Sequence, residues 1–204
     1  YEQMQQLAVH GARVLNAQAV EFARRAGIVI YARSTAAGGG VTRVGAAAGA
    51  DGAAVGVSGM RDLVNVRGDG GTGQLAAMVD VLEEHGVSAL RAGLHDGQPS
   101  LWLGRDNCPD FAALRERLDR VPGMTWFEQG LEAATVVGEG LGDDPLHLRR
   151  ALELVRELGA PLHRVDTAPL RLTLFLRPGM VDRVVRALHR RFIEAVPDAD
   201  RASV

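Results

Sequence analysis

The sequence predicts an α+β fold made of two tandem ferredoxin-like domains, each a βαββαβ unit. One supersecondary unit runs almost without interruption through residues 133–194, and a similar unit precedes it at 62–128. The alternation of apolar and polar residues at period 2 predicts the strands, and apolar residues at helical spacing predict the helices. A βαβ connection is right-handed in nearly every known protein, so both helices of such a unit should cover one face of a small antiparallel sheet.

The later unit begins at the β-branched run Ala134–Val137, and a turn rich in glycine follows over 138–145. A helix is expected from about 146 to 158, because leucines recur there at helical spacing before Gly159. Strands are predicted at 162–165 and 170–176, and Pro178 with Gly179 ends the second of them. A last helix over 181–192 has arginines on its polar face.

The earlier unit repeats this order. A short edge strand is expected at Ala53–Val57 and a separate first strand at Asp62–Val66. The turn 67–73 leads into a helix that ends at Gly86, and Asp96-Gly97 marks a hairpin between 87–94 and 98–103. A second helix over 111–118 and a last strand over 124–128 complete the unit. The expected domains are 53–130 and 131–204, with strands free to be exchanged between them.

Residues 1–52 precede both domains. Two short helices are predicted, the second from about Ala17 to Arg25 and closed by Gly27, followed by a strand at 28–32. The small residues of Ser34–Gly52 predict a linker. Because the chain opens on a helical pattern and has no initiator methionine, we expect it to be part of a longer protein.

The composition excludes several kinds of function. All 23 basic residues are arginine, so no lysine can act as a nucleophile or hold a phosphate. A net charge of −2 and 4% aromatic residues disfavour a nucleic-acid-binding domain. The sequence shows neither a signal peptide nor an apolar run of membrane-spanning length, which favours a cytoplasmic protein. The single cysteine, Cys108, lies at a helix entry and is interpreted as structural, and the histidines show no paired ligand spacing, so neither a metal nor a cofactor is expected.

Both ends of the chain resemble one enzyme family. Tyr1–Met4 and Gly11–Glu21 resemble the end of the catalytic domain of aspartate kinases. Val136–Leu141, Thr167–Thr173 and Arg186–Phe192 are similar to the second ACT domain of the same enzymes. The resemblance extends over essentially the whole chain and is weakest in its middle.

The resemblance implies the regulatory part of an aspartate kinase, which binds a feedback amino acid of the lysine or threonine class and dimerises through its ACT domains. The family's catalytic residues lie before this region, so the chain alone is expected to be inactive, and a kinase catalytic domain or subunit is a possible partner. The alternative is a diverged dimerisation module that no longer binds an effector. A ferredoxin-like domain for nucleic acid or a small substrate is disfavoured by the composition.

The expected effector site combines the turn before the first helix of the earlier unit with the second strand of the later one. The turn offers backbone N–H groups for a carboxylate and one side chain, Asp69, for an ammonium group. Pro161 replaces a polar residue of the family pattern, which predicts weak affinity, and the equivalent turn at 143–146 is expected not to bind. The predicted contacts are Asp69, Gly70, Gly71, Thr72, Gly73, Gln74, Pro161, Leu162, Asp166 and Thr167.

The sheet faces away from the helices are expected to pair two chains. Leu172 and Leu174, with their counterparts Leu101 and Leu103, are the apolar residues predicted for this homodimer interface. Arg171 alternates with these leucines and is expected to form a salt bridge at the border of the interface.

Overall fold

The computed structural model describes residues 1–12, 14–33, 41–46 and 54–194. The chain divides into two compact units. Unit 1 comprises Tyr1–Gly59 and Ala133–Val204, and unit 2 comprises Met60–Glu132. The two divisions fall inside the long strands β3 (Ala54–Gly68) and β6 (Thr125–Gly138), so each of these strands contributes to both units. The units are described separately below.

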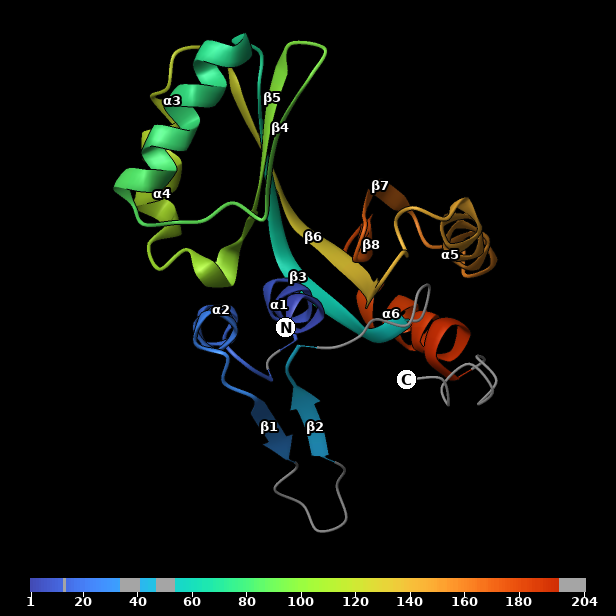
Figure 1. The fold of residues 1–204 in the computed structure, drawn as a ribbon. Helices are drawn as coiled ribbons and strands as arrows, with labels where there is room; N and C mark the ends of the chain where they lie inside the picture. Colours follow the sequence, from blue (N-terminus) through green and yellow to red (C-terminus); the bar gives the residue numbers. More distant parts are fainter. Residues whose placement is uncertain (13, 34–40, 47–53, 195–204) are drawn as a thin grey trace. The chain divides into compact units, whose positions relative to one another are not determined.

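Unit 2 has the ferredoxin-like order βαββαβ. After β3 come helix α3 (Gly71–Glu84), the hairpin strands β4 (Arg91–His95) and β5 (Gln98–Gly104), helix α4 (Phe111–Asp119) and strand β6. A short 3-10 helix, η1 (Arg105–Asn107), leads into α4. The strands lie in the order β4-β5-β3-β6, and Asp96 and Gly97 both have positive φ in the hairpin turn. Figure 1 shows α3 and α4 on one side of β4 and β5.

The core of unit 2 lies between this sheet and its two helices. Alternate residues of β3 and β5 point toward the helices, and Met78, Leu114 and Leu118 meet them there. Asn65 and Trp102 occupy the intervening positions and are also buried. The strand residues on the helix side are Val64, Val66, Leu101 and Leu103.

Unit 1 follows the same order with one difference. From β6 the chain forms helix α5 (Pro145–Glu157), strands β7 (Leu162–Ala168) and β8 (Arg171–Leu176), helix α6 (Val181–His189) and a π-helical turn, η2 (Arg190–Glu194). The strand order is β7-β8-β6-β3, so the fourth strand comes from the start of β3, far upstream in the sequence. A Cβ at Gly59 would lie 2.8 Å from Val181, which shows how closely this part of β3 packs against α6.

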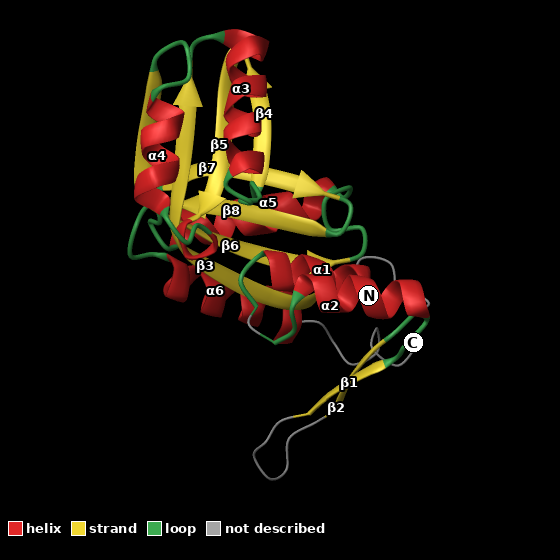
Figure 2. Ribbon diagram, turned by 90° about the vertical axis from the view of Figure 1, so that its left-hand side faces the viewer, coloured by secondary structure: helices red, strands yellow, loops and turns green. Residues whose placement is uncertain are grey.

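Two helices and a hairpin open unit 1. The Asn16 side chain accepts hydrogen bonds from two backbone N–H groups at the start of α2 (Ala17–Ala26), and Gly27 ends that helix in the left-handed conformation. Strand β1 (Ile30–Arg33) pairs with β2 (Val41–Val44), and Figure 2 shows this hairpin beyond α2. Helix α1 (Glu2–Val9) joins α2 through Gln5, whose amide donates to Glu21 at 2.8 Å.

The second face of the unit 1 sheet is covered by α1. A Cβ at Gly56 would lie 3.1 Å from the Leu7 side chain, and Arg171 Nε donates to the Gln6 side-chain oxygen at 3.1 Å. Helices α5 and α6 pack on the opposite face, against a cluster that includes Leu172 and Leu174. This sheet is therefore covered on both faces within unit 1.

The structure confirms the α+β class and the two ferredoxin-like units, and it corrects several details. The strands expected separately at 53–57 and 62–66 belong to one strand, β3, which begins at Ala54 and runs through Asp62 despite the positive φ of +53° at that residue. In the same way, the strands expected at 124–128 and 134–137 are both part of β6. The linker expected over 34–52 is wrong at 41–44, which forms β2, while 34–40 and 47–52 lie outside the described residues.

The assignment of the leucines to an open sheet face is also wrong. Leu172 and Leu174 lie under α5 and α6, and Leu101 and Leu103 lie under α3 and α4. The leucines alternate along their strands as predicted, but periodicity alone does not say which of the two sheet faces receives the helices. Arg171 lies on the face covered by α1, where it pairs with Asp166 of its own chain.

Candidate functional site

The predicted turn before α3 is held closed by its own side chains. Gln74, one turn into the helix, is only 3% exposed. Its Oε1 accepts a hydrogen bond from the Gly70 N–H at 2.7 Å, and its Nε2 donates to the Met124 carbonyl oxygen at 3.2 Å. A further contact of 3.4 Å joins Nε2 to Thr125 Oγ1. Gln74 therefore links the helix N-terminus to the start of β6 and does not point outward.

Asp69, the residue expected to receive an ammonium group, is engaged in the same way. Its Oδ1 accepts from the Met124 N–H at 2.8 Å. Gly71 has a φ of +66°, a conformation that favours glycine, while Thr72 and Gly73 are exposed at the surface. The turn thus has the predicted position at the start of a helix, but two of its predicted binding groups already have partners within unit 2.

The second predicted stretch lies on β7 in unit 1. Pro161 is exposed and its carbonyl oxygen accepts from the Arg177 N–H at 3.2 Å, while Leu162 packs against the core cluster of unit 1. Asp166 Oδ2 lies 3.3 Å from Arg171 Nη2, and both side chains are largely buried. Thr167 is exposed. Since Asp69–Gln74 and Pro161–Thr167 belong to different units, the combined site stays a prediction.

His10 extends the polar group around Arg171. The imidazole is 5% exposed, and its Nδ1 lies 2.8 Å from the Gln6 carbonyl oxygen at the end of α1. Burial lowers the pKa of His10 to about 4. The positive charge of Arg171 also lowers this pKa, whereas the hydrogen bond to the Gln6 carbonyl oxygen and the negative charge of Asp166 act to raise it. His10 is therefore neutral at pH 7. Sequence reasoning did not single out this residue, because its burial depends on the docking of α1.

The turn before α5 is closed by backbone packing. Asp144 caps the helix, since its Oδ1 accepts from the Leu146 N–H at 2.8 Å, and Pro145 takes the first helical position. A Cβ at Gly142 would lie 2.0 Å from the Ala168 carbonyl oxygen, so this turn fits directly against the end of β7. Its failure to bind an effector, expected from the sequence, stays a prediction.

A hollow of about 760 Å³ at the start of α4 was missed by the sequence analysis. Asp62, Arg105 and Asp110 contribute to its lining. Arg105 Nε lies 3.8 Å from Asp62 Oδ2, and the guanidinium lies over the Phe111 ring. Asp110 caps α4 by accepting from the Ala113 N–H at 3.0 Å. Asp62 and Arg105 therefore pair with each other, and Asp110 caps the helix.

Other functional features are limited in the described parts of the chain. Cys108 is buried, its Sγ lies 3.5 Å from the Gly104 carbonyl oxygen, and burial raises the pKa of the thiol, so it is not activated as a nucleophile. Within residues 1–12, 14–33, 41–46 and 54–194, no three acidic, histidine or cysteine side chains gather as a metal site would require. None of the helices in these ranges combines the length and apolarity needed to cross a bilayer.

The fold and the two closed turns define a class of protein, a pair of ferredoxin-like units with a helical segment docked on one of them. Similarity to known proteins narrows this class. No model of a protein family matches the chain. An aspartokinase from Thermus thermophilus is 26% identical over 212 residues, which cover 94% of this chain. The chain spans about half of that relative, 50% of its length.

Solved structures show the same fold. Escherichia coli aspartokinase III in complex with lysine and aspartate matches with a TM-score of 0.74 at 18% identity, over 94% of this chain and 45% of that one. The regulatory subunit of aspartate kinase from Thermus flavus matches with a TM-score of 0.57 at 21% identity, over 69% of this chain and 99% of that subunit. The resemblance to aspartate kinases and their regulatory subunits is thereby confirmed.

Proposed function

We propose that this chain is the regulatory region of an aspartate kinase, which binds a feedback amino acid of the lysine or threonine class and pairs with a second copy. The likeness to a Thermus flavus regulatory subunit, 99% of which is covered, supports a regulatory role. The E. coli enzyme in the matching structure was solved with lysine and aspartate, which supports an amino acid as the effector class.

The proposal rests on one observation: polar contacts connect helix α1 to the β7–β8 hairpin. Arg171 contacts both Gln6 on α1 and Asp166 on β7, at 3.1 and 3.3 Å. Helix α1 belongs to the segment that resembles the end of a kinase catalytic domain. An effector that changes the Asp166–Arg171 pair would therefore also change how α1 is held, and this gives a physical route from regulator to enzyme.

Asp166 and Arg171 pair with each other, and an amino acid that separated them would meet a carboxylate for its ammonium group and a guanidinium for its carboxylate. Calorimetric titration of the chain with each proteinogenic amino acid tests the proposal. We expect heat at millimolar concentration with lysine or threonine, and a loss of roughly tenfold or more in affinity for Asp166→Asn. The exposed pair formed by Glu157 and Arg191 supplies a matched control, Glu157→Gln, that should leave binding unchanged. Absence of heat with every amino acid would leave the alternative of a dimerisation module.

The dimer proposal needs a surface other than the buried leucines. Strand β4 lies at the edge of the unit 2 sheet, and Leu94 on it is 42% exposed. An edge strand leaves backbone N–H and C=O groups unpaired, and a strand of a second copy can pair with them and extend the sheet. Light scattering should show a dimer at micromolar concentration that Leu94→Glu weakens, while the equally exposed Val79→Glu on α3 does not. A monomeric chain under these conditions contradicts the proposal.

A catalytic domain or subunit is the partner proposed for the N-terminal helices and hairpin. Phe22 is 68% exposed, and Ile28, Tyr31 and Val41 are also exposed in this segment. Four large apolar side chains exposed within one segment make this segment the candidate for contact with the partner. We expect the chain alone to form no aspartyl phosphate from ATP and aspartate. Mixed with the catalytic domain of an aspartokinase, it should make activity sensitive to the effector, and Phe22→Asp should prevent this while leaving calorimetric effector binding intact.

A further inference from the structure

The side chain of Gln74 fills a space walled by glycines in unit 2. A Cβ at Gly68 would lie 2.0 Å from Gln74 Oε1, and one at Gly70 would lie 2.9 Å from Gln74 Cβ. A Cβ at Gly123 would lie 2.8 Å from Gln74 Nε2. Three glycines on two backbone segments, 68–70 and 123, therefore lie around this carboxamide, and a Cβ at any of them would require the Gln74 side chain to move.

The hydrogen bonds of this carboxamide are those that a small polar ligand would make. Its oxygen accepts a hydrogen bond from a backbone N–H at a helix N-terminus. A bound carboxylate or amide usually places its acceptor oxygen in this position. Its nitrogen donates to the carbonyl oxygen of Met124, 50 residues further along the chain. Asp69 adds a second link from the turn to the Met124 N–H.

We propose that Gln74 is a built-in ligand of this turn. It occupies a latent carboxamide site, holds the turn against the start of β6, and prevents a free amino acid from binding there. The proposal is independent of the effector binding proposed for Asp166 and Arg171, since it concerns residues of unit 2 alone. It accounts for a turn that is built like a binding site and yet has its groups satisfied.

Removal of the side chain tests the proposal directly. Gln74→Ala should lower the melting temperature by several degrees and leave a glycine-walled space with unsatisfied polar groups. Propionamide at millimolar concentration should then raise the melting temperature of Gln74→Ala and leave the original chain unaffected, because only the variant has a vacant site. Gln98, which is exposed on β5, provides the control variant Gln98→Ala, for which neither change is expected. An equal response of the original chain and Gln74→Ala to the amide overturns the proposal.

A second substitution keeps the test decisive if the amide binds too weakly. The φ of Gly68 lies outside the left-handed region, so alanine fits its backbone, and the three atoms nearest to the added Cβ all belong to the Gln74 side chain. Gly68→Ala should lower the melting temperature of the original chain and have little effect, or a stabilising one, in the Gln74→Ala background. Additive effects of the two substitutions would show that Gln74 does not occupy the space, and the proposal would fail whatever the outcome of the amino-acid titrations.

Discussion

The hydroxyl oxygens of Thr135 and Thr173 lie 3.0 Å apart across β6 and β8, and both side chains are 1% exposed. Each hydroxyl is taken out of water, and each has the other as its hydrogen-bond partner. Such a pair is typical of a sheet face that is fully covered, here by α1.

Thr173→Val should destabilise the chain by about 1 to 3 kcal/mol, because it leaves the Thr135 hydroxyl buried without this partner. The double variant Thr135→Val/Thr173→Val should recover part of that loss, since neither position then carries an unsatisfied hydroxyl. Urea unfolding followed by circular dichroism measures both. A double variant whose loss equals the sum of the single losses would show that the hydroxyls are not coupled.

The positive φ of Asp62 in β3 predicts a backbone effect that can be separated from its charge. Asp62→Val should cost about 1 to 3 kcal/mol, since β-branched residues are rarely found at φ +53°. Asp62→Asn removes the charge but tolerates this φ, and the half-exposed pair with Arg105 contributes only about 0 to 1 kcal/mol. It should therefore be almost neutral. An equal loss for both variants in denaturant unfolding would assign the effect to the charge.

His10 predicts a loss of stability in mild acid. Its pKa is about 4 in the folded chain against an ordinary value of 6.5, so the unfolded chain binds the proton more readily between these values. The free energy of unfolding should be fully retained above pH 6.5 and fall by up to about 3 kcal/mol as the pH drops to 4. His10→Gln should remove this part of the pH dependence. NMR titration of the imidazole provides an independent check, and an ordinary pKa would contradict the buried, neutral state.

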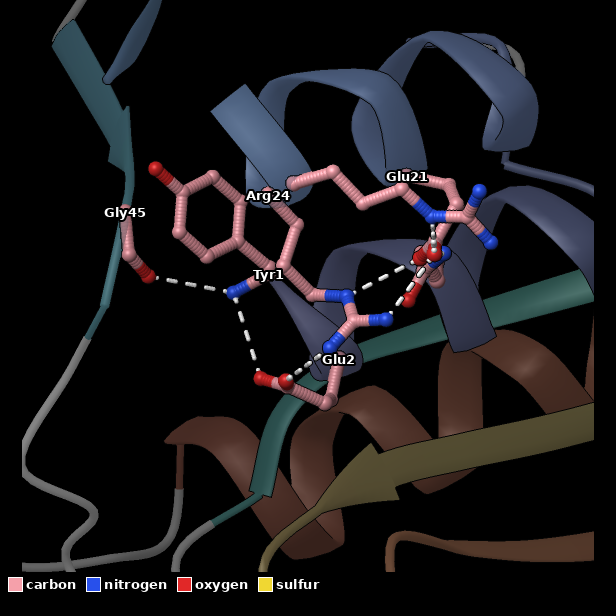
Figure 3. A network of polar contacts seen from close by, with 7 residues as sticks. Tyr1, Glu2, Glu21, Arg24 and Gly45 are labelled. Atoms are coloured by element: carbon pink, nitrogen blue, oxygen red, sulfur yellow. Dashed lines mark hydrogen bonds and ion pairs between the residues drawn. The ribbon is translucent and has the colours of Figure 1, made fainter. Parts of the chain in front are cut away.

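Glu21 predicts an effect at lower pH. Hydrogen bonds from Arg24, Arg25 and Gln5 lower the pKa of this carboxyl from 4.5 to about 2, and Figure 3 shows the network around it. Its contribution to stability should be present above pH 4.5 and be lost as the pH falls toward 2. Carboxyl NMR titration should give the low pKa, and Arg24→Met should raise it. An unchanged pKa in that variant would show that the ion pair does not form in solution.

The order of elements could be predicted because each depends on local chemistry. Helix α2 begins at Ala17 and is ended by Gly27 as expected, and Asp96-Gly97 forms the hairpin turn. Glycine and capping residues act within a few positions along the chain, so a sequence without a structure shows them. The continuity of β3 could not be read in this way, because no local pattern shows that the strand runs through Asp62 at a φ of +53°.

The candidate site was only partly predictable. The turn 69–74 was located correctly at the start of a helix, but Gln74 was expected to face a ligand and is instead buried against Met124 and Thr125. These partners lie about fifty positions away, beyond the reach of a local pattern. His10 was missed for the same reason, since its environment is made by residues near the other end of the chain.

The strand segment that completes the sheet of unit 1 precedes unit 2 in the sequence, whereas the other strands of that sheet follow unit 2. During synthesis on a ribosome, Ala54–Gly59 must therefore wait for β6, β7 and β8 to emerge, whereas Met60–Glu132 has all its strands as soon as it leaves the exit tunnel. Nascent chains generally acquire structure in the order in which complete units appear. The nested unit can thus fold first and bring the two distant parts of unit 1 together.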